Sequence, residues 1–394
     1  MAPGLALSRA GGREPGAPTA DPRSPFAAPF GTPEPVSDQH EPAGDQDGPG
    51  VDLGRCLVTG AGGYLGSELV KALARRGLEV RAFDRAYPRG APAGAEVFTA
   101  DVRSEDALRE ACADVDTVFH CASVINTVAL ARPAVRDEVW SINVGGTEKL
   151  LAAARAAGAR RFVYTSSVNV VVDRPYAGGD ERAPYASGKL DLYTETKAAA
   201  EKRVLDADGA PSGDGVLHTA AIRPGGIYGP GEPQHFPRSV REILRGMYVV
   251  RIAGGKGWAD NVYIDDLVEA HRLAATHLGE GGAANGQAYF INDGEPQSYF
   301  DFFGPVAEAL GRTPPRLSVP AAPVHAVAFL AELAHYLGGP YPFLTRMELF
   351  KLVHHHWFSV DKARRELGWR PRVGHAEGMR RSMDWVRELA ERHQ

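Results

Sequence analysis

The stretch RCLVTGAGGYLGSELVKALARRG, residues 55–77, decides the fold. It reads as a short β-favouring strand that runs into Gly60, Gly63 and Gly66 at the start of a helix. In this context the missing Cβ atoms let the backbone approach a pyrophosphate, whose charge the helix N-terminus stabilises. An ordinary turn accounts for one glycine but not for three at this spacing.

A second strand, residues 79–84, ends at Asp84, 18 residues after Gly66. A carboxylate at this position accepts hydrogen bonds from the ribose hydroxyls of NAD and repels the 2′-phosphate of NADP. Arg85 follows directly, and a guanidinium there accommodates NADP. The sequence therefore predicts NAD, with NADP as the alternative.

Strand-like and helix-like segments alternate through the first half of the chain. A strand ends near Asp101, another covers 116–123, and a third, 160–167, delivers Ser166 and Ser167 at its carboxyl end. A helix whose start Asn143 marks lies between the last two. This alternation predicts an α/β fold, a Rossmann-type doubly wound parallel sheet with right-handed crossovers.

The pattern also suggests a division of the chain. Residues 1–52 are rich in proline and glycine and predict a disordered tail, whereas residues 53–230 form the NAD-binding domain, to which 261–278 return. Residues 231–260 and 279–394 are expected to form a smaller, mostly helical cap that binds the substrate.

Tyr193 and Lys197 stand four residues apart in a segment rich in helix formers, so they share a helix face. An ammonium beneath the phenol is expected to lower the tyrosine pKa and make Tyr193 a usable base. Tyr185 and Lys189 have the same spacing, but Pro184 and Gly188 interrupt a helix there. Tyr193 is therefore the favoured residue.

Composition excludes several classes of protein. The net charge of −5 and the pI near 6.2 argue against nucleic-acid binding. The three cysteines lack metal-ligand spacing and read as reduced core residues of a cytoplasmic protein, and no metal is expected. No apolar run is long enough for an ordinary spanning helix, and residues 323–337 predict a cap helix for which peripheral membrane contact stays open.

A series of motifs gives the chain a family resemblance. In order they are TGAGGYLG (59–66), HCAS (120–123), NVGGT (143–147), YTSS (164–167), YTETK (193–197), RPGGIYGPG (223–231), NVYIDDLVEAHRLA (261–274) and GQAYFINDGEP (286–296). The chain resembles an extended short-chain dehydrogenase/reductase, within it the branch of 3β-hydroxysteroid and sterol-4-carboxylate dehydrogenases. The resemblance covers about Gly54 to the C-terminus.

The resemblance implies a catalytic set of Ser167, Tyr193 and Lys197, supported by Asn143, with Ser166 as the rival serine. Residues of the motifs and residues at the ends of the second and third strands are expected to bind the dinucleotide. From the motifs they are Gly60, Gly63, Tyr64, Leu65, Gly66, Ala122, Ser123, Lys197, Pro224 and Ile227, and from the strand ends Asp84, Asp101 and Val102.

The resemblance further implies oxidation of a secondary alcohol on a bulky apolar substrate by a protein that forms a homodimer. Three alternatives stay open: a nucleotide-sugar epimerase or dehydratase, a reductase of 2-alkyl-3-oxo acids, and a nucleotide-sensing protein without catalysis. An epimerase needs cations for a diphosphate, for which Arg238, Arg241 and Arg245 are candidates without forming a convincing cluster.

Overall fold

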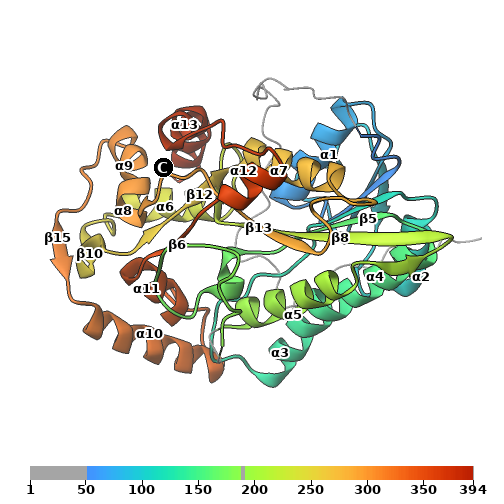
Figure 1. Cartoon of the computed structure of the whole chain (residues 1–394). Helices are drawn as coiled ribbons and strands as arrows, with labels where there is room; N and C mark the ends of the chain where they lie inside the picture. The colour runs from blue at the N-terminus through green and yellow to red at the C-terminus, as the bar shows by residue number, and fades with distance from the viewer. Residues whose placement is uncertain (1–50, 188–190, 394) are drawn as a thin grey trace, which may run out of the picture. The chain divides into compact units, whose positions relative to one another are not determined.

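A computed structural model describes residues 51–187 and 191–393 of the chain. The tail expected over residues 1–52 lies almost wholly outside this range, as does Lys189. The described part contains the expected doubly wound sheet with flanking helices, which confirms the fold class (Figure 1).

Seven parallel strands form the main sheet in the order β13-β8-β5-β4-β1-β2-β3, and the short strand β7 (Ala210–Ser212) pairs antiparallel with β8. In chain order the seven are β1 (Cys56–Thr59), β2 (Val80–Asp84), β3 (Glu96–Thr99), β4 (Thr117–His120), β5 (Arg161–Thr165), β8 (Gly215–Pro224) and β13 (Gln287–Ile291). The strand order reverses between β1 and β4, so a crevice for a ligand is expected at their carboxyl ends.

Helices cover both faces of the sheet (Figure 1). Helices α1 (Tyr64–Arg75) and α7 (Ile264–Thr276) cover one face, and α2 (Glu105–Cys112), α4 (Gly146–Ala156) and α5 (Leu192–Asp206) cover the other. Successive side chains of β1 point to opposite faces of the sheet, so both faces are apolar and need a cover. Cys56 and Val58 belong to the core with α1 and α7, whereas Leu57 belongs to the core with α2 and α4.

One helix begins earlier than the sequence predicted. The sequence placed its start at Asn143, but α3 (Pro133–Trp140) precedes it and runs through a π-helical turn, η1 (Ser141–Gly145), into α4. A π turn inserts a residue into a continuous helix and often lies at a functional site. Here it buries Asn143, which is 1% exposed.

The cap contains more strand than the sequence predicted. Its helices are α6 (His235–Leu244), α8 (Tyr299–Phe302), α9 (Gly304–Ala309), α10 (Ala321–Tyr336) and α11 (Arg346–Val353). A four-stranded sheet joins β14 (Gln297–Ser298), β11 (Trp258–Ala259), β16 (His356–Phe358) and β6 (Tyr176–Gly179). Two parallel pairs complete the cap side, β10 (Val250–Ile252) with β15 (Leu317–Val319), and β9 (Gly226–Tyr228) with β12 (Asn261–Tyr263).

The boundary between the two regions is interleaved along the chain. Strand β13 lies in the range that the sequence assigned to the cap, yet it is the last strand of the main sheet. Strand β6 lies in the range assigned to the NAD-binding domain, yet it pairs with β16. The chain then closes with α12 (Asp361–Glu366), which packs on β13, and α13 (His375–Glu391), which packs on α6.

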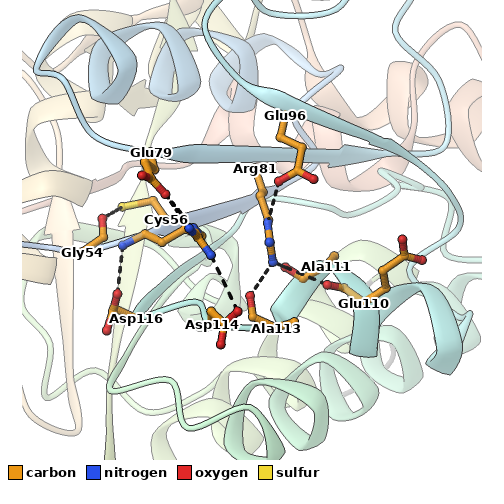
Figure 2. A network of polar contacts seen from close by, with 11 residues as sticks. Gly54, Cys56, Glu79, Arg81, Glu96, Glu110, Ala111, Ala113, Asp114 and Asp116 are labelled. Carbon is orange, nitrogen blue, oxygen red and sulfur yellow. Dashed lines mark hydrogen bonds and ion pairs between the residues drawn. The ribbon is translucent and has the colours of Figure 1, made fainter.

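The amino-terminal edge of the main sheet carries a network of charged groups (Figure 2). Arg55 Nε donates to Glu79 Oε2 at 2.8 Å, and Arg81 Nε donates to Glu96 Oε2 at 2.9 Å. The Arg55 amide also donates to Asp116 Oδ2 at 2.9 Å. Because ligands of open α/β sheets bind at the carboxyl ends of the strands, this network ties strands together rather than forming a site.

A buried ion pair fixes α5 to the sheet. Arg223 in β8 donates through Nε to both carboxylate oxygens of Glu201 in α5, each at 3.1 Å, and both side chains are at most 4% exposed. Breaking such a pair leaves an uncompensated buried charge.

We therefore expect Glu201→Gln to lower the free energy of unfolding by about 3–5 kcal/mol, measured by urea denaturation. The matched control is Asp106→Asn, which removes an exposed pair with Arg109, and it should cost less than about 1 kcal/mol. Equal effects of the two substitutions would contradict the prediction.

Candidate active site

The candidate residues converge on the carboxyl edge of the main sheet. Gly60 follows β1, Asp84 ends β2, Ala122 lies just beyond β4, and Ser167 lies just beyond β5. Pro224 ends β8 at the same edge, since all these strands are parallel. The structure thus brings these candidates together at the edge of the sheet where the sequence analysis expected the chemistry.

The glycine turn has a shape that side chains would fill. Gly60 has φ of +74°, and a Cβ on Gly66 would lie 2.1 Å from the carbonyl oxygen of Gly60. Gly62, which the sequence analysis did not single out, is equally tight, with a Cβ position 2.0 Å from Ala86 O. Gly63 caps α1 without a side-chain hydrogen bond, so the first amides of the helix are available to a pyrophosphate. The turn fits a dinucleotide.

Asp84 has a second role beside its expected one. Its Oδ2 accepts the Gly62 amide at 2.9 Å, so the carboxylate holds the glycine turn. Burial raises its pKa, and the backbone amides of Gly62 and Ala86 oppose this effect. The carboxylate expected to bind the ribose thus also holds the turn expected to bind the pyrophosphate.

Other predicted cofactor residues differ in what their side chains can reach. Leu65 and Val102 are each 7% exposed and belong to the apolar cores, so their side chains serve packing. Asp101 is ion-paired with Arg103 at 2.6 Å, which lowers its pKa. The buried Tyr64 hydroxyl has no hydrogen-bond partner among the described residues.

The segments after β4 and β8 line the same edge. The Ala122 amide lies only 2.6 Å from the position a Cβ would take on Gly60, and Ser123 follows it half-buried. Ile227 lies in β9 and pairs with Val262 of β12, which brings the segment after Pro224 beside the returning chain. The cofactor roles of these four residues remain predictions.

Ser167 and Tyr193 meet in the structure. The Ser167 side chain lies beside the Tyr193 side chain, and its interaction with the phenol lowers the tyrosine pKa. The Tyr193 amide donates to Asn126 O at 2.9 Å, which ties the start of α5 to the loop after β4. Ser166 is 2% exposed, and its hydroxyl has no partner among the described residues. Of the two serines, Ser167 is the one in contact with Tyr193.

Lys197 is buried beneath this pair, at 1% exposure. Its ammonium donates to the carbonyl oxygen of Thr165, the last residue of β5. It also lies 4.4 Å from the ring centroid of Tyr164, whereas the sequence predicted that it would face the Tyr193 ring.

The expected direction of the tyrosine pKa is wrong for the protein alone. Burial raises the pKa of Tyr193 to about 12, and burial lowers the pKa of Lys197 to about 7. The sequence argument considered only the neighbouring cation, whereas desolvation disfavours both charged forms and dominates here.

Asn143 holds the lysine segment in place. Its Nδ2 donates to Thr196 Oγ1 at 2.9 Å and to Val124 O at 3.0 Å, and its Oδ1 accepts the Val124 amide at 2.8 Å. Thr196 directly precedes Lys197, so the support that the sequence predicted reaches the lysine through its neighbour in the chain.

Two residues near the reaction centre escaped the sequence analysis. Asp191 caps α5 by accepting the amide and the hydroxyl of Thr194, at 2.9 and 2.8 Å. An aspartate three residues before a threonine at the start of a helix is an N-cap pattern that can be recognised in the sequence. Asn169 donates its amide to Ser167 Oγ at 3.2 Å, and no sequence pattern marks it.

The described residues contain no group of three histidine, cysteine, aspartate or glutamate side chains placed to hold a metal ion. Of the three cysteines, Cys56 and Cys112 are buried and Cys121 is half-buried, each as a free thiol.

Comparison with known proteins gives consistent relatives. Residues 57–321 match the model of the "3-beta hydroxysteroid dehydrogenase/isomerase family". A 3 beta-hydroxysteroid dehydrogenase/Delta 5-->4-isomerase of Mycobacterium tuberculosis is 42% identical over 327 residues, 82% of this chain and 87% of that protein. The human short-chain dehydrogenase/reductase family 42E member 1 is 40% identical over 80% of this chain and 83% of its own.

Solved structures share the architecture. The UDP-glucose 4-epimerase of Thermus thermophilus, in complex with NAD, is 26% identical and superposes with a TM-score of 0.64 over 84% of this chain and 99% of its own.

The two roles of Asp84 generate a prediction. We expect Asp84→Asn to lower NAD affinity about tenfold or more, because hydrogen bonds to a charged group contribute about 1.5–3 kcal/mol, and to narrow the preference for NAD over NADP. Calorimetric titration with each dinucleotide measures both effects. Glu96→Gln, on the neighbouring strand β3, serves as the control and should bind NAD normally; unchanged NAD affinity in the Asp84 variant would contradict the ribose role.

Proposed function

Because the chain belongs to the 3-beta hydroxysteroid dehydrogenase/isomerase family, we propose that it oxidises a secondary alcohol on a bulky apolar, steroid-like substrate to the ketone. The observation that carries this proposal is the contact between Ser167 and Tyr193 above the buried Lys197, at the carboxyl edge beside the glycine turn. The cofactor is NAD, with NADP as the alternative, and when bound it would supply the hydride acceptor.

The chain's own residues bind the alcohol and move its proton. The Ser167 hydroxyl hydrogen-bonds the substrate oxygen and holds it beside Tyr193, and the phenolate of Tyr193 accepts the hydroxyl proton. With a pKa of about 12 in the protein alone, Tyr193 needs positive charge nearby to deprotonate. The oxidised nicotinamide ring would supply it, and the Lys197 ammonium would bind the ribose.

The cap argues for an apolar substrate over a nucleotide sugar. A diphosphate needs uncommitted cations, and Arg238, the first arginine of the candidate set, is already engaged. It pairs with Glu242 and Glu348, each at 2.8 Å, and it stacks 5.2 Å from the ring of Phe343. A nucleotide-sensing protein would have no use for the contact between Ser167 and Tyr193.

A substrate panel tests the proposal: NAD or NADP with a 3β-hydroxysteroid, a UDP-sugar and a 2-alkyl-3-oxo acid, followed by the absorbance of the reduced cofactor. Steroid oxidation supports the proposal. Turnover of the UDP-sugar without steroid oxidation would replace it with the epimerase alternative.

Tyr193→Phe should abolish turnover, at least a thousandfold in kcat, while NAD binding stays near normal, because it removes only the proton acceptor. Tyr185→Phe is the matched control, since Tyr185 has the same spacing to a lysine but donates to Glu201 at 2.8 Å. That variant should keep kcat within about twofold to threefold, with some loss of stability. Full activity of the Tyr193 variant would remove this residue from the mechanism.

We further propose that α10 rests on a membrane surface, from which an apolar substrate enters. The one charged residue between Leu317 and Leu344 is Glu332, which is buried and paired with Arg346 at 2.9 Å. The segment's outer surface is apolar and aromatic. Its exposed large side chains are Leu317, Val327, Phe329, Leu330, Leu333, Tyr336, Leu337, Tyr341 and Phe343.

The charges beside this apolar surface favour a lipid bilayer, rather than a second copy of the protein, as its binding partner. Exposed Arg312 and Arg316 precede the segment, and cations beside an apolar helix favour anionic lipid headgroups. The helices of residues 51–187 and 191–393 are each too short or too polar to cross a bilayer, so the contact is peripheral.

Vesicle flotation with mixed anionic and neutral phospholipids measures this contact. We expect the native chain to float with the vesicles, and the double variant Leu330→Glu, Leu333→Glu to remain with the soluble fraction while it keeps its activity on a dissolved alcohol. Val216→Glu, which changes an exposed valine of β8, is the control and should float. Equal flotation of all three proteins would refute the proposal.

The homodimer and the cytoplasmic location are proposals that rest on the sequence alone. Sedimentation equilibrium of the purified chain measures the first, and fractionation of the producing cell measures the second. Steroid oxidation in the substrate panel would support a role in steroid biosynthesis.

A further inference from the structure

One ammonium of the cap reaches the catalytic edge of the sheet. Lys351 lies in α11 and donates from Nζ to Asn169 Oδ1 at 2.6 Å, across 182 residues of sequence. Within the described residues no carboxylate oxygen lies within 4.0 Å of this ammonium. Burial lowers its pKa, and the more distant carboxylates of Asp191 and Glu348 oppose this effect, so the ammonium lies in a poorly solvated place without a direct counter-ion.

The acceptor of this bond is part of the catalytic serine's environment. Asn169 is 5% exposed and lies in the short helix η2 (Val168–Val171), which begins directly after Ser167. Its backbone amide donates to Ser167 Oγ at 3.2 Å. An amide that occupies a lone pair of Oγ leaves the Ser167 proton free to be donated toward Tyr193 and the substrate oxygen.

Packing joins the same two elements. Met347 of α11 and Phe358 of β16 belong to one apolar cluster with Val168, Val170 and Val171. Met347 and Lys351 are four residues apart and therefore share one face of α11. That face carries an apolar anchor and a polar one, and both hold the segment that carries the catalytic hydroxyl.

We propose that Lys351 is a positioning residue: through Asn169 it orients Ser167 for proton transfer, so that catalysis requires α11 to be seated on η2. This inference rests on the proposed function for its kinetic readout. A purely structural bond would change stability without a selective loss of kcat, and a substrate-binding lysine would change KM without acting through Asn169.

The experiment is a double-mutant cycle on the full chain, with Lys351→Met, Asn169→Ala and the two combined. We expect each single variant to lower kcat for alcohol oxidation about tenfold or more and to leave the KM for NAD within about twofold. The combined variant should be no slower than the single ones, because both remove the same link. Lys351→Arg keeps a donor and should recover most of the rate.

Lys362→Met is the matched control. Lys362 is also desolvated and lies in α12, but its ammonium donates to Gln287 Oε1 at 2.7 Å and Ala288 O at 3.0 Å, away from Ser167. The Lys362→Met substitution should leave kcat within about twofold of the native value, even where it lowers the melting temperature.

Three results would overturn the inference. The first is a loss of kcat in the combined variant equal to the product of the two single losses, the second is an effect on the KM for the substrate alone, and the third is an equal loss of kcat in Lys351→Met and Lys351→Arg.

Hydrogen exchange of residues 166–172 separates this inference from the proposed function, because it needs no turnover. Exchange there should quicken in Lys351→Met but not in Lys362→Met. A native chain that oxidises no steroid refutes the function, whereas unchanged exchange in Lys351→Met refutes the positioning role.

Discussion

The structure depends on a stripe of polar groups that α5 buries against the sheet. Tyr193, Lys197 and Glu201 follow one another at intervals of four residues and therefore share a face of the helix. The first meets Ser167, the second donates to Thr165 O at the end of β5, and the third pairs with Arg223 of β8. Buried charges are costly unless each has a partner. The catalytic geometry follows from this pairing, because α5 has one register in which all three groups are satisfied.

Local backbone signals made much of this predictable from the sequence. The glycine turn is read correctly because its residues stand between a strand and a helix, and the structure shows the close approaches that exclude a Cβ. Tyr193 was preferred to Tyr185 because helix formers follow it, and α5 does begin at Leu192. In both cases the deciding information lies within about one turn of chain.

The failures have tertiary causes. The helix entering Asn143 starts at Pro133 because the π turn at Ser141–Gly145 is continuous with α3, and no local cap marks that junction. Strand β13 returns to the main sheet beside β8, a pairing that joins residues 67 positions apart, such as Gln287 and Ala220. The pKa of Tyr193 needed knowledge of its burial, and the contact between Lys351 and Asn169 joins segments 182 residues apart. Long-range contacts of this kind leave no periodic trace in one sequence.

Electrostatics links the site to its cofactor. In the protein alone, burial favours the neutral forms of both Tyr193 and Lys197, with pKa values of about 12 and about 7. Near neutral pH burial thus favours the protonated phenol and disfavours the charged lysine. Positive charge beside Tyr193 stabilises the phenolate and lowers its pKa, while hydrogen-bond acceptors around Lys197 stabilise the ammonium and raise its pKa. On the proposed function, an oxidised dinucleotide bound at this edge would supply both kinds of group, which would link its binding to the release of the tyrosine proton.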